Sequence, residues 1–273
     1  MPSEKVNLTK EQETLLGTLY GRALDSRSKN PILNDTAAGG IVDRIDFDFR
    51  KLKVQKDDIL NIVIRAKQLD LWTKAFLADH SEATVLHLGC GLDSRVDRVA
   101  RSKNVRWYDL DYPEVIELRR RFYPPRDGYF MIGSSVTDST FLDKVQTSGP
   151  VLIIAEGLFM YLAEAEVKGL LQRLTSHFQG GQLTFDVWDA LSVWVSRHQP
   201  TFVITDKNKG WGVNDLRTIE EWVPRLQLVR EIAWTEAIGR ESDKISPGFR
   251  VVFGLVNCFP SLRRMERFLL YQF

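Results

Sequence analysis

The chain has 273 residues, of which 44% are hydrophobic, 11% aromatic and 27% charged. This composition is typical of a globular protein and excludes a disordered or fibrous chain. The formal net charge of +1 gives no strong field toward nucleic acid or an anionic membrane, so we expect neither as a partner. The short basic runs at 119–121 and 263–264 are then interpreted as solvated helix faces.

The cysteine content and the N-terminal sequence indicate a cytoplasmic protein. Cys90 and Cys258 are the two cysteines, and they provide no disulfide framework. Met1–Lys5 precedes no apolar segment, and no stretch approaches the ~18 apolar residues of a membrane span. A chain of this length lies near the upper limit for one hydrophobic core, so we expect one domain over residues 1–273. As a separate expectation, we assign no bound metal to the chain.

The chain begins with helical patterns. Thr9–Gln12 has the sequence of a capping box, and apolar residues follow at helical spacing as far as Leu24. A polar stretch over 25–40 interrupts this pattern, and a second helix is predicted over 57–78. Two helices therefore precede any strand, and we expect residues 1–80 to form a helical cap.

From residue 83 onward, short β-rich runs alternate with helical segments. Such alternation indicates an α/β fold with a parallel sheet covered by helices. Four parallel strands are predicted at 83–89, 105–111, 129–134 and 151–157, with helices at 94–101, 113–122 and 164–178. Three more strands are predicted at 182–188, 226–234 and 250–259, the last two as an antiparallel pair connected through 236–247.

The segment 189–222 does not fit this alternation. It contains Trp194 and Trp211 and follows Trp188, so we expect an insertion over the strand ends that acts as a substrate lid. These tryptophans could wall a flat apolar pocket, although aromatic side chains in such a segment are often simple packing residues.

The first strand runs into a glycine turn, where an open parallel sheet binds its ligands. Gly89 and Gly91 permit a tight turn and the close approach of a ligand. A dinucleotide-binding loop needs a third glycine, but Ser94 occupies that position, which argues against NAD. Asp109 and Asp111 end the second strand on one face, where carboxylates can hold a ribose diol. We therefore expect a nucleoside-containing cofactor.

Three further charged residues fall among apolar neighbours. Glu156 follows the fourth strand and needs a partner, unless it caps the next helix. Asp70 lies on the apolar face of the second helix and must also be paired. Arg65 on the same helix could form a bidentate pair with a ligand carboxylate, and a surface arginine is the equal alternative.

Three segments of the chain resemble the leucine carboxyl methyltransferase family, which includes bacterial polyketide O-methyltransferases of the tetracenomycin type. They are Leu86–Arg95, Trp107–Ile116 and Glu156–Leu162, in this order along the chain, and the likeness extends over roughly residues 15–190. The resemblance implies a class I, Rossmann-like methyltransferase sheet of seven strands, the last antiparallel, that binds S-adenosyl-L-methionine.

The resemblance also implies roles for individual residues. Asp111 would bind the ribose, Arg65 the carboxylate of the cofactor, and Glu156 its methionyl end, while Tyr161 would face the methyl-transfer region together with Glu156. The remaining cofactor contacts are expected from the loop and strand ends, at Gly89, Gly91, Asp93, Asp109, Ser135 and Val136.

Several residues depart from the family pattern. His87 stands where Asn or Asp is frequent, Arg119 where Lys is usual, and Ser135 where an Asp near the adenine is common. The adenine contact could then pass to Val136 or Asp138.

The expected function is an S-adenosylmethionine-dependent O-methyltransferase acting on a carboxylate or hydroxyl of a small aromatic or polyketide-like molecule. A carboxylate acceptor needs no base, whereas a phenol would benefit from one, for which His177 and His198 are candidates or else ordinary surface histidines. The alternatives are a protein C-terminal leucine carboxyl methyltransferase, an inactive scaffold with this fold, and an NAD-dependent oxidoreductase.

Overall fold

Seven strands form one mixed sheet in the order β3-β2-β1-β4-β5-β7-β6. The computed structural model describes residues 4, 14–99, 101–196, 210–245, 251, 254, 258–259 and 263–273. The strands are β1 (Ala83–Leu88), β2 (Val105–Asp111), β3 (Tyr129–Gly133), β4 (Val151–Ala155), β5 (Gly181–Trp188), β6 (Gln227–Ala233) and β7 (Glu266–Gln272). The first five pair in parallel, and β7 is antiparallel to both β5 and β6. The predicted seven-stranded α/β fold with an antiparallel last strand is confirmed.

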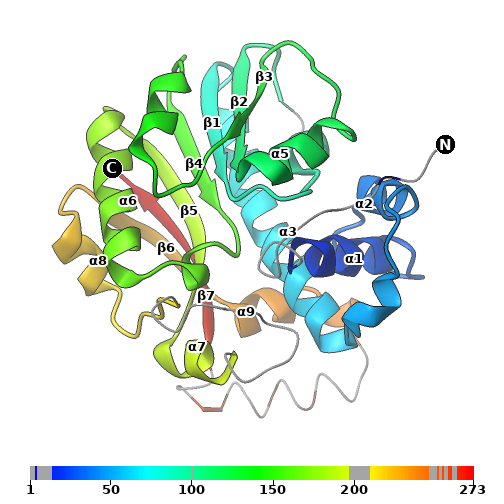
Figure 1. Ribbon diagram of the computed structural model, residues 1–273. Coiled ribbons are helices and arrows are strands. Elements are labelled where there is room, and N and C mark those ends of the chain that lie inside the picture. Colours follow the sequence, from blue (N-terminus) through cyan, green and yellow to red (C-terminus); the bar gives the residue numbers. More distant parts are fainter. Residues whose placement is uncertain are drawn as a thin grey trace.

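Helices lie on both faces of the sheet (Figure 1), because its central strands are apolar on both sides. All six residues of β1 are buried. On one face lie α1 (Thr14–Ser26), α2 (Thr36–Val42), α3 (Lys56–Asp79) and α9 (Trp234–Gly239). On the other face lie α6 (Glu164–His177) and α8 (Arg217–Trp222). The remaining helices are α4 (Arg95–Arg98), α5 (Pro113–Arg120), α7 (Ala190–Ser196) and the short 3-10 helices η1 (Phe49–Leu52), η2 (Ser139–Lys144), η3 (Phe159–Tyr161) and η4 (Ser242–Lys244).

The predicted N-terminal helical cap is present. α1 and α2 pack together, and α3 lies between them and the strands (Figure 1). The capping box at Thr9–Gln12 lies outside the described residues. The polar stretch 25–40 was predicted as a break, but it contains the start of α2, which Asp35 caps by accepting a hydrogen bond from the Ala38 backbone at 3.1 Å. The described chain contains no helix that is long and apolar enough to cross a membrane.

The prediction of a strand at 250–259 is wrong. Val251 and Gly254 are helical, and Val251 and Phe259 are 66% and 57% exposed. The seventh strand is instead β7, whose first residues Glu266 and Arg267 are charged but only 6% and 3% exposed. A strand that begins with two charged residues is not predicted from apolar runs, because charged residues are seldom buried unless they are paired. The predicted connection at 236–247 likewise contains helical residues of α9 and η4.

Candidate active site

A cavity of about 790 Å³ opens at the carboxyl ends of β1, β2 and β4. Its floor is made by the loops that follow these strands, and α1, η1 and α3 contribute to its walls. Nine of the ten predicted site residues line it, namely Arg65, Gly89, Gly91, Asp93, Asp111, Ser135, Val136, Glu156 and Tyr161. His87, one of the departures from the family pattern, lines it too. The cavity has the size of a small-molecule site.

The glycine turn after β1 has the conformation that its sequence requires. Gly89 and Gly91 have φ angles of 60° and 49°, in the left-handed region that favours glycine. A Cβ on Gly89 would lie 3.1 Å from the Leu158 side chain, so this position also demands a close approach. The turn therefore exposes backbone, rather than side chains, to whatever the cavity binds.

Asp111 ends β2 beside this turn. Its Oδ2 accepts from the Gly91 backbone at 2.7 Å, and its Oδ1 accepts from the Tyr112 backbone at 2.7 Å. Burial raises the pKa of Asp111, while these two backbone donors act in the opposite direction. The carboxylate is thus held rigidly at the edge of the cavity, with lone pairs left for a diol.

Asp109 lies beneath the turn and not in the cavity lining. It is fully buried, and it accepts from Arg119 at 2.5 Å, from Tyr129 Oη at 2.6 Å and from Trp107 Nε1 at 2.8 Å. Burial by itself raises the pKa of Asp109, but Arg119, His87 and Tyr129 together outweigh burial and lower the pKa to about 2. The predicted cofactor role of Asp109 is therefore replaced by a supporting one.

Arg119 corrects a second expectation, since the run 119–121 is not wholly solvated. Its side chain is fully buried, and its Nη1 donates to the Gly91 carbonyl at 3.0 Å. Arg120 and Arg121 remain exposed. The Asp109–Arg119 pair thus braces the glycine turn from below, which explains a cationic residue at this position.

The residues expected near the adenine base of the cofactor follow β3. Ser135 and Val136 line the cavity after β3, and Ser135 Oγ lies 2.8 Å from Thr137 Oγ1. Asp138 is not part of the lining, because its carboxylate caps η2 by accepting from the Thr140 backbone at 2.9 Å. The backbone and side chains of 134–136 are therefore the groups that could contact an adenine base.

Glu156, at the opposite end, has the partner that its position requires. Its carboxylate forms ion pairs with Arg95, by a short contact, and with Arg65 at 3.4 Å. Burial raises its pKa, yet the two arginines outweigh burial and hold the pKa below its ordinary value. The alternative of a simple helix cap is wrong, because Glu166 of the next helix makes that contact with the Ala163 backbone at 2.8 Å.

The Glu156 pair belongs to a larger buried ionic network. Asp70 of α3 is paired with Arg95 at 2.7 Å and with Arg98 at 2.8 Å, as its burial predicted. Asp93 is paired with Arg98 at 2.6 Å and with Arg95 at 3.4 Å. The network joins α3 to the loop after β1, so it fixes the helical cap over the cavity.

Arg65 is buried and not a surface residue. It lies between Glu156 at 3.4 Å and Asp186 at 3.5 Å, both long distances for charge-assisted hydrogen bonds. A Cβ on Gly157 would come within 3.0 Å of its Nη2, so glycine is needed where the chain passes the guanidinium. Arg65 faces the cavity with donors that these two carboxylates do not bind closely.

Arg22 of α1 was missed by the sequence analysis. It lines the cavity and is only 3% exposed. Its nearest acids are Asp35 at 3.5 Å and Asp93 at 4.0 Å, and among the described residues no group accepts a hydrogen bond from its Nε. The 3.5 Å distance is from Nε to Asp35, and both acids are far for charge-assisted hydrogen bonds, so this buried guanidinium can bind a further anion in the cavity. Position 22 lies three residues after Leu19 on the apolar face of the helix, and this spacing was the available signal.

The outer part of the cavity is apolar and aromatic. It is lined by Trp188 of β5, Trp234 of α9 and Met265, the residue before β7. Trp211 packs in the core against Phe159 and Trp222, while Trp194 is 59% exposed. Of the three predicted tryptophans, only Trp188 therefore borders the cavity. No described residue of 189–222 lines it, and the lid stays a prediction.

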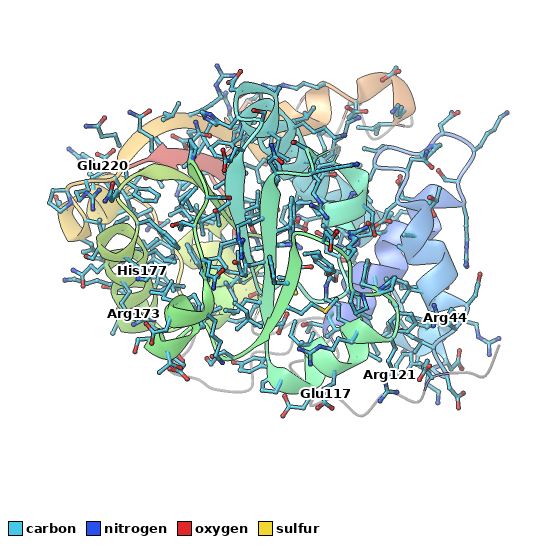
Figure 2. All side chains as sticks on the ribbon, turned by 90° about the horizontal axis from the view of Figure 1, so that it is seen from above. Arg44, Glu117, Arg121, Arg173, His177 and Glu220 are labelled. Carbon is cyan, nitrogen blue, oxygen red and sulfur yellow. The ribbon has the colours of Figure 1, made fainter. Side chains whose placement is uncertain are left out.

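Neither candidate histidine is placed at the cavity. His177 is exposed at the end of α6, and Figure 2 shows it on the outer side of the molecule near Arg173. His198 lies outside the described residues. Among the residues that the structure describes, no group of His, Cys, Asp or Glu side chains is arranged to hold a metal ion.

The strand order, the glycine turn and the acid at the end of β2 define a class I methyltransferase fold. A protein from Thermobifida fusca YX assigned as a methyltransferase has a TM-score of 0.57 to this chain at 14% identity, covering 98% of this chain and 95% of its own. At such an identity, this likeness concerns the fold alone.

The chain belongs to the leucine carboxyl methyltransferase family, whose model matches residues 15–123. It is 39% identical over 270 residues to the tetracenomycin polyketide synthesis O-methyltransferase TcmP of Streptomyces glaucescens, covering 99% of both chains. It is 35% identical to the S-adenosyl-L-methionine-dependent methyltransferase dpfgK of Gibberella zeae, covering 82% of both. The predicted family is confirmed.

Proposed function

We propose that this protein is an S-adenosyl-L-methionine-dependent O-methyltransferase that acts on a carboxylate or hydroxyl of a small aromatic or polyketide-like molecule. The observation that carries the proposal is a single cavity with a fixed carboxylate, Asp111, at one end and two buried arginines, Arg22 and Arg65, at the other. This polarity matches a ribose diol and an amino-acid carboxylate. The identity to two methyltransferases over most of the chain supports the same conclusion.

The residues present fit this cofactor. Asp111 would accept from the ribose hydroxyls, and the backbone at Gly89 and Gly91 leaves room for the chain between ribose and sulfur. Arg22 faces its two acids at long distances only, so we assign its guanidinium to the cofactor carboxylate together with Arg65. Glu156 and Asp93 hold these arginines, and their carboxylates are near enough to favour an ammonium group. Ser135 and Val136 would border the adenine.

The bound cofactor supplies a sulfonium methyl group for an in-line displacement. The task of the chain is then alignment, because proximity and orientation can lower such a barrier by about 7–11 kcal/mol. Tyr161 borders the cavity after β4 and would position the acceptor oxygen. Trp188, Trp234 and Met265 would hold a flat apolar body and exclude water.

Calorimetric titration with S-adenosylhomocysteine tests the proposal. Saturable micromolar binding by the wild type is expected, with Asp111→Ala and Arg65→Ala each at least about tenfold weaker through the lost charge-assisted hydrogen bonds. Glu117→Gln on the exposed side of α5 is the matched control and should bind as the wild type does. Thermal melts of each variant separate lost binding from lost folding. Absence of binding by the wild type would reject the cofactor and favour the scaffold alternative.

A screen of aromatic acids and phenols with radiolabelled cofactor then tests turnover. Transfer to a small acid or phenol supports the proposed substrate class. Transfer to a peptide with a C-terminal leucine, and to none of the small molecules, would support the leucine carboxyl methyltransferase alternative instead.

A further inference from the structure

A buried polar pair lies at the end of the cavity away from the glycine turn. Glu266 is the first residue of β7, and it faces Trp188, the last residue of β5, in the antiparallel register. Its Oε2 accepts a short hydrogen bond from Asn61 Nδ2 of α3. The two residues are 205 positions apart in sequence, and only the packing of α3 onto β7 brings them together.

The neighbours of this pair belong to the cavity wall. Asn61, Trp188 and Met265 line the cavity, whereas Glu266 lies behind them and is 6% exposed. Asn61 precedes Arg65 by one helical turn, so the two side chains share one face of α3. The proposed cofactor would occupy the carboxyl ends of β2, β1 and β4. The end of β5 and the start of β7, and therefore this pair, are then left to the substrate.

The direction of the hydrogen bond decides what Asn61 offers. The structure has the Asn61 NH₂ group turned to Glu266 and its carbonyl oxygen elsewhere. An ionised Glu266 carboxylate enforces this orientation, because it can only accept. Because Glu266 engages the Asn61 NH₂ group, the carbonyl oxygen is the group that Asn61 offers to the cavity it lines. An amide oxygen that borders an apolar and aromatic pocket is a hydrogen-bond acceptor of fixed orientation, and such a group selects a ligand that carries a hydroxyl.

Resting on the proposed function, we propose that Asn61 Oδ1 accepts a hydrogen bond from a hydroxyl group of the aromatic substrate, and that Glu266 is the positioning residue that fixes the Asn61 amide. The methyl group need not go to this hydroxyl, since the pair lies beside the acceptor region and orients the ring.

The charge state of Glu266 gives a second handle on the same pair. Burial raises the pKa of Glu266 to about 8, and the nearby Asp186 of β5 adds to this rise. Arg65 of α3 and the hydrogen bonds from Asn61 and Trp188 oppose it. Below that pKa a neutral Glu266 can also donate, so the amide of Asn61 can turn over. Above it, Glu266 only accepts and the amide is locked. Preference for the hydroxyl should therefore increase as the pH rises through about 8.

The test measures binding and does not need turnover. The wild type is saturated with S-adenosylhomocysteine and titrated with 2-naphthoic acid and with its 3- and 6-hydroxy derivatives, using the fluorescence of Trp188 and Trp234 in the cavity wall. At least one hydroxy acid should bind about tenfold more tightly than 2-naphthoic acid at pH 8.5.

Two variants assign this preference to the pair. Asn61→Leu should abolish it, while the affinity for 2-naphthoic acid stays within about twofold of the wild type. Glu266→Gln should keep part of it, because an amide still accepts from Asn61, but should remove its dependence on pH. A substitution that only loosened the fold would weaken the binding of all three acids by the same factor.

The proposal is overturned if the cofactor-loaded wild type does not distinguish the acids, whether all bind equally or none binds. It is also overturned if Asn61→Leu weakens all of them by the same factor. Failure of the wild type to bind S-adenosylhomocysteine would instead reject the proposed function, so the two failures are distinguishable.

Discussion

At the glycine-turn end, the cavity is built from short segments that directly follow β1, β2, β3 and β4, where the glycine turn presents backbone groups and Asp111 presents a carboxylate. At the opposite end, its walls come from α3, β5, α9 and the residue before β7, and the groups that face the cavity are large or charged side chains. The first end is therefore determined locally by the chain, whereas the second exists only after distant elements have packed. This difference suits a fixed cofactor beside a variable substrate.

The support beneath the glycine turn gives the largest expected effect. Arg119→Met leaves Asp109 buried without its cation, which should lower the free energy of unfolding by about 3–5 kcal/mol. Denaturant unfolding followed by circular dichroism measures the loss. Arg120→Met, the exposed neighbour on the same helix, should change stability by less than about 0.5 kcal/mol. Equal losses for both variants would show that the turn does not depend on the buried pair.

Arg22 joins the two ends, because α1 belongs to the cap but its guanidinium faces the cofactor region. Arg22→Met should weaken S-adenosylhomocysteine binding by about tenfold to a hundredfold, the value of a charge-assisted hydrogen bond. Arg27→Met is the matched control, since Arg27 pairs with Asp43 near the surface at 2.7 Å and does not line the cavity. If both variants bind as the wild type does, the carboxylate site lies elsewhere.

Glu266 at the substrate end should make the stability of the protein depend on pH. Its pKa is raised to about 8 from the ordinary 4.5, so between these values the folded state keeps a proton that the unfolded state has lost. Stability is therefore fully present below about pH 4.5 and falls as the pH rises toward 8, by about 5 kcal/mol for a shift of this size.

Glu266→Gln should remove this loss, so the variant gains on the wild type as the pH increases from 5.5 to 8.5. Denaturant midpoints at several pH values give the difference between the two proteins, in which the other titrating groups cancel. Glu117→Gln on the exposed face of α5 should show no such trend. A constant difference between Glu266→Gln and the wild type would mean that Glu266 is ionised throughout.

How far the sequence predicts each end follows from the same contrast. The glycine turn, Asp111 and Glu156 could be found because each directly follows a strand, so a local pattern fixes its place. Asp70 and Arg65 could be found because a charge on the apolar face of a helix is conspicuous. Arg22 carried the same signal on α1, and there it was overlooked.

The rest depended on contacts between distant segments. Asp109 and Asp111 share one face of β2, and only the packing of Arg119 and Tyr129 shows that the first is buried beneath the turn. Glu266 could not be found at all, because the β-rich run at 250–259 competed with the true last strand. Asn61 had no local signal, since its role depends on a partner 205 residues away.

His177 gives the smallest expected effect and sharpens the contrast at the substrate end. It is exposed in the last turn of α6, where interaction of a basic side chain with the helix dipole stabilises a helix by at most about 1 kcal/mol. The centroid of its ring lies 4.8 Å from that of Phe178. His177→Asn should therefore leave cofactor binding and the pH dependence of methyl transfer unchanged. A changed pH profile would require the end of α6 to reach the cavity, which the exposed position of His177 in Figure 2 does not allow.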